Sequence, residues 1–183
     1  MQTAPVIVSA CPDYSPEASS RAIREIAEHS PVLQAVSPGM KIVIKANLVT
    51  LLRPEKAATT HPALIAALTD YLKERGAAVT VGDGPGGSFT RGYLDGVYAA
   101  SGMRQTGAEM NENFTVKHAE YPEAAVLKDF DYTGYLDQAD LIINFCKLKT
   151  HGMMGLSCAV KNMFGAIPGL TKPAYHYRFP AYP

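Results

Sequence analysis

Short β-branched runs alternate with amphipathic helical stretches through most of this chain. The predicted strands are residues 6–9, 41–47, 77–81 and 140–146, and the predicted helices are residues 15–35, 60–76, 90–100 and 157–164. Strands that are separated by helices favour right-handed crossovers and parallel pairing. The sequence therefore predicts an α/β protein of the Rossmann-like kind, with a mainly parallel sheet and helices on both faces.

Two helix boundaries are marked by residues with known end preferences. Ser15 followed by Pro16 is typical of a helix start, and Gly76 is typical of a helix end. Residues 104–134 are less regular, and short strands are predicted there at residues 116–117 and 125–127. With 183 residues the chain has room for one sizeable core, so residues 1–183 are predicted to form a single α/β domain. Residues 170–183 are expected to be an extension of it or the start of a second half.

Cysteine usage and hydropathy indicate the compartment. The chain has three cysteines, and an odd number argues against a disulfide framework. No stretch approaches the roughly 18–20 consecutive apolar residues that a membrane-spanning helix needs. We therefore expect a cytoplasmic protein without a membrane partner.

Charge is distributed unevenly along the chain. No acidic residue occurs from Leu141 to Pro183, whereas the first 140 residues carry a net charge of −5 in a chain that is neutral overall. The basic residues of the last segment are Lys147, Lys149, Lys161, Lys172 and Arg178. Five cations are too few for a surface that follows a nucleic acid backbone. Their mixture with glycine, methionine and serine is more typical of a site for a small anion.

Three predicted strands end in polar or glycine-rich sequence. These ends are residues 45–47, residues 82–87 and residues 144–155. Since ligands of parallel α/β sheets bind beyond the carboxyl ends of the strands, we expect the three segments to meet in one crevice. The predicted ligand contacts in the first two segments are Asn47, Asp83, Gly84, Gly86 and Gly87. The glycine loop either presents amides to an anion or is a tight turn in which Asp83 accepts backbone hydrogen bonds.

The third segment supplies the predicted cations. Its predicted ligand contacts, together with those of the helix that follows, are Lys147, Lys149, Ser157, Lys161 and Asn162. A helix beginning near Ser157 would add amide donors and a positive dipole end. His151 lies among the lysines, which disfavour its charged form, and this suits a neutral acid/base or a metal ligand. A hydrogen-bonded structural role is the alternative for this residue.

Cys146 and Cys158 are twelve residues apart and are predicted to approach each other across the turn. They form a redox pair, two metal ligands or two small buried side chains.

Several of these residues resemble a known family. The run from Lys147 to His151, then Gly155, then the run from Lys161 to Gly165, is similar to the signature of the domain-of-unknown-function family 362. The segments around Asn47 and Asp83 resemble earlier blocks of that family. Many members carry a ferredoxin-like cysteine cluster, which implies iron–sulphur redox work, but this chain has no closely spaced cysteine quartet. The family usually continues into a second α/β half, so we expect a C-terminal half to be lacking here.

A second resemblance is local. The spacing of His151, Gly155, Ser157 and Lys161 is similar to a block of the nickel-pincer lactate racemase family. That resemblance implies proton transfer by His151 and a pyridinium cofactor held by Lys161. The racemase block has a glycine pair before the lysine, where this chain has Cys158, Ala159 and Val160.

These observations lead to one main hypothesis and two alternatives. The main hypothesis is a crevice that binds an anionic small molecule or cofactor, with the catalytic status left open and no particular cofactor selected. The first alternative is an accessory module of an iron–sulphur protein with a redox partner. The second is a non-catalytic fragment that associates with a partner or with itself as a homo-oligomer.

Overall fold

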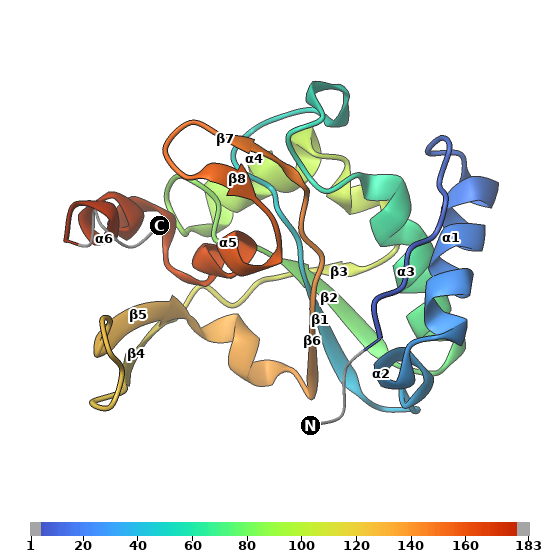
Figure 1. The fold of residues 1–183 in the computed structure, drawn as a ribbon, viewed down its shortest axis with the longest axis horizontal. Helices are drawn as coiled ribbons and strands as arrows, with labels where there is room; N and C mark the ends of the chain where they lie inside the picture. Colours follow the sequence, from blue (N-terminus) through green and yellow to red (C-terminus); the bar gives the residue numbers. More distant parts are fainter. Residues whose placement is uncertain (1–4, 179–183) are drawn as a thin grey trace.

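The computed structural model describes residues 5–178, and for Arg178 the backbone alone. Its central element is a sheet of four parallel strands in the order β3-β2-β1-β6. The strands are β1 (Lys41–Lys45), β2 (Ala78–Gly82), β3 (Glu109–Met110) and β6 (Leu141–Asn144). Lys45 is in register with both Gly82 and Asn144, so β1, β2 and β6 end at the same level. The predicted α/β fold with a parallel sheet is confirmed (Figure 1).

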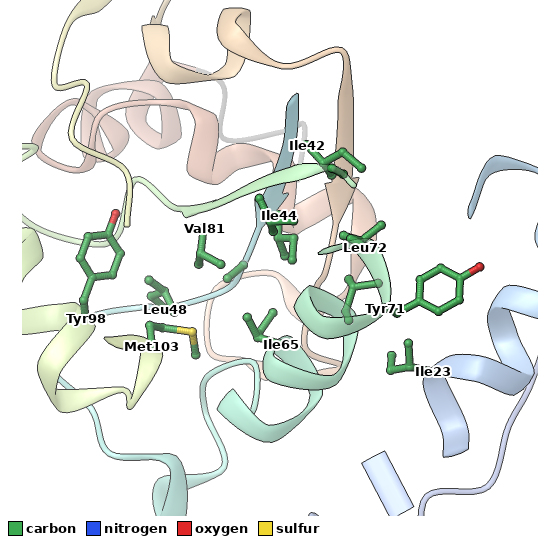
Figure 2. Close-up of a cluster of buried hydrophobic side chains, with 14 of the residues drawn as sticks. Ile23, Ile42, Ile44, Leu48, Ile65, Tyr71, Leu72, Val81, Tyr98 and Met103 are labelled. Carbon is green, nitrogen blue, oxygen red and sulfur yellow. The ribbon is translucent and has the colours of Figure 1, made fainter. Parts of the chain in front are cut away.

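Three helices cover one face of this sheet. They are α1 (Pro16–Glu28), α3 (Pro62–Glu74) and α4 (Arg91–Ala100). Their apolar positions recur at helical spacing and pack on the β-branched residues of β1 and β2 in the main core. Figure 2 shows Ile44 and Val81 of the sheet gathered with Ile65 and Leu72 of α3. Burial of this apolar area supplies most of the favourable free energy of folding.

The opposite face carries a smaller core. Val43 packs there with Tyr135 and Leu136 of the 3-10 helix η3 (Gly134–Gln138), and Ala166 borders the same cluster. The sheet therefore has helical cover on both faces, as predicted.

The remaining elements lie between and after these layers. They are α2 (Pro31–Gln34), η1 (Pro54–Lys56), η2 (Met103–Gln105), β4 (Val116–Glu120), β5 (Asp129–Thr133), β7 (Lys149–His151), β8 (Gly155–Ser157), α5 (Ala159–Met163), η4 (Phe164–Ala166), η5 (Gly169–Thr171) and α6 (Lys172–Arg178). Two antiparallel hairpins, β4–β5 and β7–β8, stand outside the main sheet. None of the helices in the described part of the chain is both long and apolar enough to span a membrane.

The predicted strand at residues 6–9 is wrong. Residues 5–14 contain neither strand nor helix, and Val6 and Val8 are about nine-tenths exposed, at 91% and 87%. A β-branched run becomes a strand only where a neighbouring strand accepts its backbone hydrogen bonds, and β1 pairs with β2 and β6 instead.

Several predicted boundaries also differ from the structure, and three of the differences have a clear cause or consequence. The first helix does begin at Pro16 with the Ser15 hydroxyl as its cap, but it ends at Glu28 rather than near residue 35. Pro31 removes an amide and clashes with a continuing helix, so a separate short helix starts there. The strand expected at residues 125–127 lies at 129–133, and the last helix begins at 159 because residue 157 belongs to β8. Within the expected extension at residues 170–183, the described part ends in α6, and residues 179–183 lie outside the described residues.

Candidate functional site

A cavity of about 190 Å³ opens at the carboxyl ends of β1, β2 and β6. The three sequence segments expected to meet there all contribute to its lining, and the β7–β8 hairpin follows directly beyond β6 (Figure 1). The predicted contacts that line it are Asn47, Asp83, Gly84, Gly86, Lys147, Lys149, His151, Ser157, Lys161 and Asn162. The structure therefore brings together residues that are more than 100 positions apart in sequence.

Gly87 does not line the cavity. A Cβ atom at this position would stand 2.6 Å from a ring carbon of Tyr93, so the absence of a side chain permits close packing on α4. The neighbouring glycines do line the cavity, but their amides are already engaged. The N–H of Gly84 donates to the Gly165 carbonyl at 2.9 Å, and that of Gly86 donates to the Val49 carbonyl at 2.7 Å. The loop shapes the cavity wall, and these two amides are not open donors.

A buried ion pair forms the floor of the site. Lys45 Nζ lies 2.6 Å from Asp83 Oδ1, and the two side chains are 0% and 4% exposed. The ammonium also donates to the Ala46 carbonyl at 2.8 Å, and Asp83 Oδ2 accepts from the Leu48 amide at 2.8 Å. Lys45 was not among the predicted contacts, although a lysine at the end of a buried β-branched run was a signal for it. The pair is neutral as a whole, so it adds no net charge beneath the cavity.

Asn162 links this floor to the rest of the site. Its Oδ1 accepts from Asn47 Nδ2 at 3.0 Å, and its Nδ2 donates to Asn144 Oδ1 at 2.7 Å and to the Lys45 carbonyl at 3.2 Å. Asn47 Oδ1 in turn accepts from Lys149 Nζ at 2.8 Å. This chain of side-chain amides holds Lys149 in a defined position at the cavity wall.

Four lysines surround the cavity. They are Lys147, Lys149, Lys161 and Lys172. Lys149 donates to the Ala58 carbonyl at 2.5 Å, Lys172 donates to the Gly84 carbonyl, and the Lys161 ammonium lies 4.7 Å from the centre of the Phe164 ring. Of the described residues that line the cavity, Asp83 is the one carboxylate, and Lys45 already neutralises it. The wall is therefore strongly cationic.

Burial and repulsion between ammonium groups lower the pKa of three of these lysines. Burial is the main cause for Lys149, Lys161 and Lys172, and for Lys172 it brings the pKa down to about 8. Neighbouring ammonium groups add to the lowering, whereas Asp83 opposes it in all three cases. A lowered lysine pKa means that the charged form is held at a free-energy cost in this environment.

His151 ends β7 and turns its Nδ1 atom toward the hairpin loop. That nitrogen accepts from the amides of Met153 and Met154, both at 3.2 Å. The hydrogen-bond pattern therefore assigns the proton of the neutral ring to Nε2. Burial, followed by the charge of Lys161, lowers the pKa of His151, so the ring is neutral near pH 7.

Several residues that line the cavity were not predicted as ligand contacts, and three of them come from the segment after α5. Phe164, Lys172 and His176 reach the cavity because the chain folds back after α5. Lys172 belongs to the acid-free segment, but no local pattern indicates which lysine of such a segment returns to the strand ends. Burial, and then Lys161, lowers the pKa of His176.

Cys146 and Cys158 approach each other as predicted, with their sulfur atoms 3.9 Å apart. Cys158 is exposed and lines the cavity, so the interpretation of both as small buried residues is wrong for it. Burial raises the pKa of the Cys146 thiol. The described residues contain no group of three or more His, Cys, Asp or Glu side chains arranged to hold a metal ion.

Replacing Gly84 by alanine should lower the free energy of unfolding by about 1–3 kcal/mol. A Cβ atom there would stand 2.5 Å from the Gly165 carbonyl oxygen and 2.9 Å from that of Ile167, and backbone atoms cannot rotate away. Urea unfolding measures the loss. Gly92→Ala is the matched control, because a Cβ atom at this α4 position meets nothing within 4 Å. The free energy of unfolding of the control should rise by about 0.5–1 kcal/mol from helix propensity. An equal change in the free energy of unfolding of the two variants would contradict the close approach at Gly84.

Comparison with known proteins identifies relatives. The sequence profile of the domain of unknown function DUF362 matches residues 42–181. A protein of Synechocystis sp. described as the thylakoid-associated protein sll1697 is 29% identical over 147 residues, which cover 77% of this chain and 43% of that protein. The chain thus spans less than half the length of this curated relative. No solved structure matches. The similarity to the lactate racemase family stays a prediction.

Proposed function

This chain belongs to the DUF362 family, and we propose that it binds a small anionic molecule in the cavity at the carboxyl ends of β1, β2 and β6. The observation that carries the proposal is the charge of the wall. Lys147, Lys149, Lys161 and Lys172 face one small volume, and the carboxylate beside them is already paired with Lys45. An anion at their centre would supply the missing counter-charge.

Electrostatics support binding of an anion over that of a neutral ligand. Burial and repulsion lower the pKa of three of the four lysines, and a bound anion would raise each of these values again. By linkage, a ligand that raises the pKa of these lysines binds more tightly to the protein in which they are charged. A carboxylate, phosphate or sulfate group offers several acceptor oxygens for ammonium donors.

The neutral side chains would orient the ligand. Nε2–H of His151 is a donor that the hairpin loop leaves unused, since the loop amides occupy Nδ1. Asn47 and Asn162 hold Lys149 and one another in place through the hydrogen bonds described above. In a reaction of the bound molecule, His151 is the candidate for proton transfer, with Nε2–H as the proton to be donated.

Lys161→Ala should weaken the binding of inorganic sulfate about tenfold, because a hydrogen bond to a charged group contributes about 1.5–3 kcal/mol. Among the described residues no carboxylate forms an ion pair with Lys161, and its ammonium lies beside the Phe164 ring. Isothermal titration calorimetry with sulfate measures the change. Lys41→Ala is the control, since Lys41 is exposed at the opposite, amino end of β1.

Each outcome of this titration is informative. Equal affinities for wild type and Lys161→Ala, with both proteins folded, would reject the residue assignment. Failure of the wild type to bind either sulfate or phosphate would reject the anion site itself. A loss in Lys41→Ala as large as that in Lys161→Ala would show that general charge, and not the cavity, attracts the anion.

A further inference from the structure

A second cavity of about 360 Å³ adjoins the cationic one. Lys161, Phe164 and His176 line both cavities, so they form a shared boundary. Most of the remaining lining of the second cavity is aliphatic, thioether or aromatic, from Val126, Leu127, Phe130, Met154, Met163 and Ile167. One cavity is thus cationic and its neighbour is apolar, with Lys161 standing where they meet.

The described contacts hold this boundary in shape. The Lys161 ammonium lies 4.7 Å from the Phe164 ring centre, and the rings of Phe164 and His176 are 4.9 Å apart. The Tyr175 hydroxyl accepts from the Asp131 amide at 3.1 Å, which ties α6 to β5 across the apolar cavity. Figure 1 shows α5 near both of these elements on the same side of the molecule. Residues 126–130 and residues 154–176 therefore build the apolar walls together.

We propose that the ligand of this site is an amphipathic anion, whose charged head group lies among the lysines and whose aliphatic or aromatic body fills the apolar cavity. This inference rests on the proposed anion site and adds the class of ligand. A wholly polar anion would leave the apolar walls against water, which costs free energy in proportion to their area. Methionine side chains such as Met154 and Met163 adapt to different apolar shapes.

The size of the apolar cavity favours a free small molecule over a membrane lipid. A volume of about 360 Å³ lies at the lower end of the range for small-molecule pockets, roughly 300–1,000 Å³. One ring or one short chain is therefore the body that the cavity suits. The shared chemistry, an anionic head on an apolar body, also occurs in lipids, so the experiment includes a separate arm for them.

The test uses phosphonates that differ only in their apolar body. Methyl-, propyl-, hexyl- and phenylphosphonate are titrated into the full chain by isothermal titration calorimetry. Affinity should rise about fourfold for each added methylene until the cavity is filled, and phenylphosphonate should bind more than tenfold tighter than methylphosphonate. Sedimentation with phosphatidylcholine vesicles containing phosphatidic acid is the lipid arm, and the protein should stay in the supernatant.

Val126→Trp should remove the rise in affinity from methyl- to hexyl- and phenylphosphonate and leave the affinity for methylphosphonate unchanged. Val126 is half-buried in a loop, and it lines the apolar cavity without reaching the cationic one. Met163→Gln, at a partly exposed position of the same cavity, is a second variant that introduces polarity instead of bulk. Val116→Trp is the matched control, because Val116 is exposed on β4 outside both cavities.

The outcomes separate this inference from the proposed function. Equal binding of all four phosphonates would overturn the amphipathic ligand and keep the anion site. No binding of any phosphonate, nor of sulfate, would overturn both. If affinity still rises along the series to the same extent in Val126→Trp and Met163→Gln, the apolar part of the ligand binds outside this cavity. Vesicle capture, with affinity that still grows at the longest chain, would overturn the free small molecule in favour of a lipid.

Discussion

Lys45→Met is expected to lower the free energy of unfolding by about 3–5 kcal/mol, which is a large part of the stability of a domain this size. The substitution leaves Asp83 almost completely buried and without its cation, at a position where the ammonium stood 2.6 Å away. Water cannot replace the lost partner, because the side chains are 0% and 4% exposed. Urea unfolding followed by circular dichroism measures the change, and the transition midpoint should fall sharply.

Two controls make this result specific. In Lys45→Met/Asp83→Asn the buried charge is gone, while the Asn oxygen still accepts from the Leu48 amide, so most of the loss should be recovered. Arg24→Ala breaks an ion pair of the same length, 2.6 Å, whose side chains are 47% and 50% exposed. That variant should lose at most about 1 kcal/mol, because water screens the pair. A loss in Lys45→Met no larger than in Arg24→Ala would show that the buried pair is not the stabilising contact.

The affinity for sulfate is expected to fall about a hundredfold between pH 7 and pH 10. Burial brings the pKa of Lys172 down to about 8, so this cation is mostly charged at pH 7 and mostly neutral at pH 10. Sulfate keeps the same charge across this range, so the change in affinity belongs to the protein. Lys149 and Lys161, whose pKa values are also lowered, should steepen the fall toward pH 10.

Lys172→Met distinguishes this lysine from its neighbours. The variant should bind sulfate more weakly at pH 7 and should lose most of the dependence between pH 7 and pH 9. Calorimetric titration at several pH values measures both proteins. A wild-type affinity that stays constant from pH 7 to pH 10 would contradict the titration of a cationic site, and an unchanged pH profile in Lys172→Met would assign the effect to another group.

Folding stability should respond to pH with the opposite sign. The pKa of Lys172 is about 8 in the folded protein and 10.5 in an ordinary environment. Between these values the unfolded chain binds more protons, so the contribution of Lys172 to the free energy of unfolding rises with pH. The same lysine thus weakens the fold when charged and strengthens anion binding. A site that holds its cations at a cost in the free state is consistent with a ligand that removes this cost.

Gly165 explains how a cationic segment from the end of the chain can rest on the buried pair. A Cβ atom there would stand 2.5 Å from Lys45 Nζ and 2.8 Å from Lys45 Cε. The backbone of residues 164–166 can therefore approach the floor of the site, and its carbonyl receives the Gly84 amide. The glycine-rich loop after β2 and the segment after α5 fit together because both lack side chains at the contact.

Local pattern was sufficient to predict most of the main sheet and its helices. Strong signals come from the β-branched runs of β1, β2 and β6 and from the apolar stripe of α3. Each of these patterns arises because one side of a short element, or all of it, is buried. Ser15 and Pro16 likewise mark the start of α1. The β7–β8 hairpin was missed because three-residue strands such as Lys149–His151 carry no readable alternation. The exposed run at residues 6–9 shows the reverse error, a strand-like composition without a pairing partner.

The convergence of polar strand ends followed from parallel topology, and so did the residues expected around one crevice. Tertiary structure alone decided how each of them is used. It paired Lys45 with Asp83, occupied the amides of Gly84 and Gly86, and placed Gly87 against Tyr93. It also returned Lys172 and His176 to the cavity from the last helix. Local sequence records the preference of a segment for strand, helix or burial, whereas hydrogen-bond partners, charge environments and cavities depend on residues that are distant in the chain.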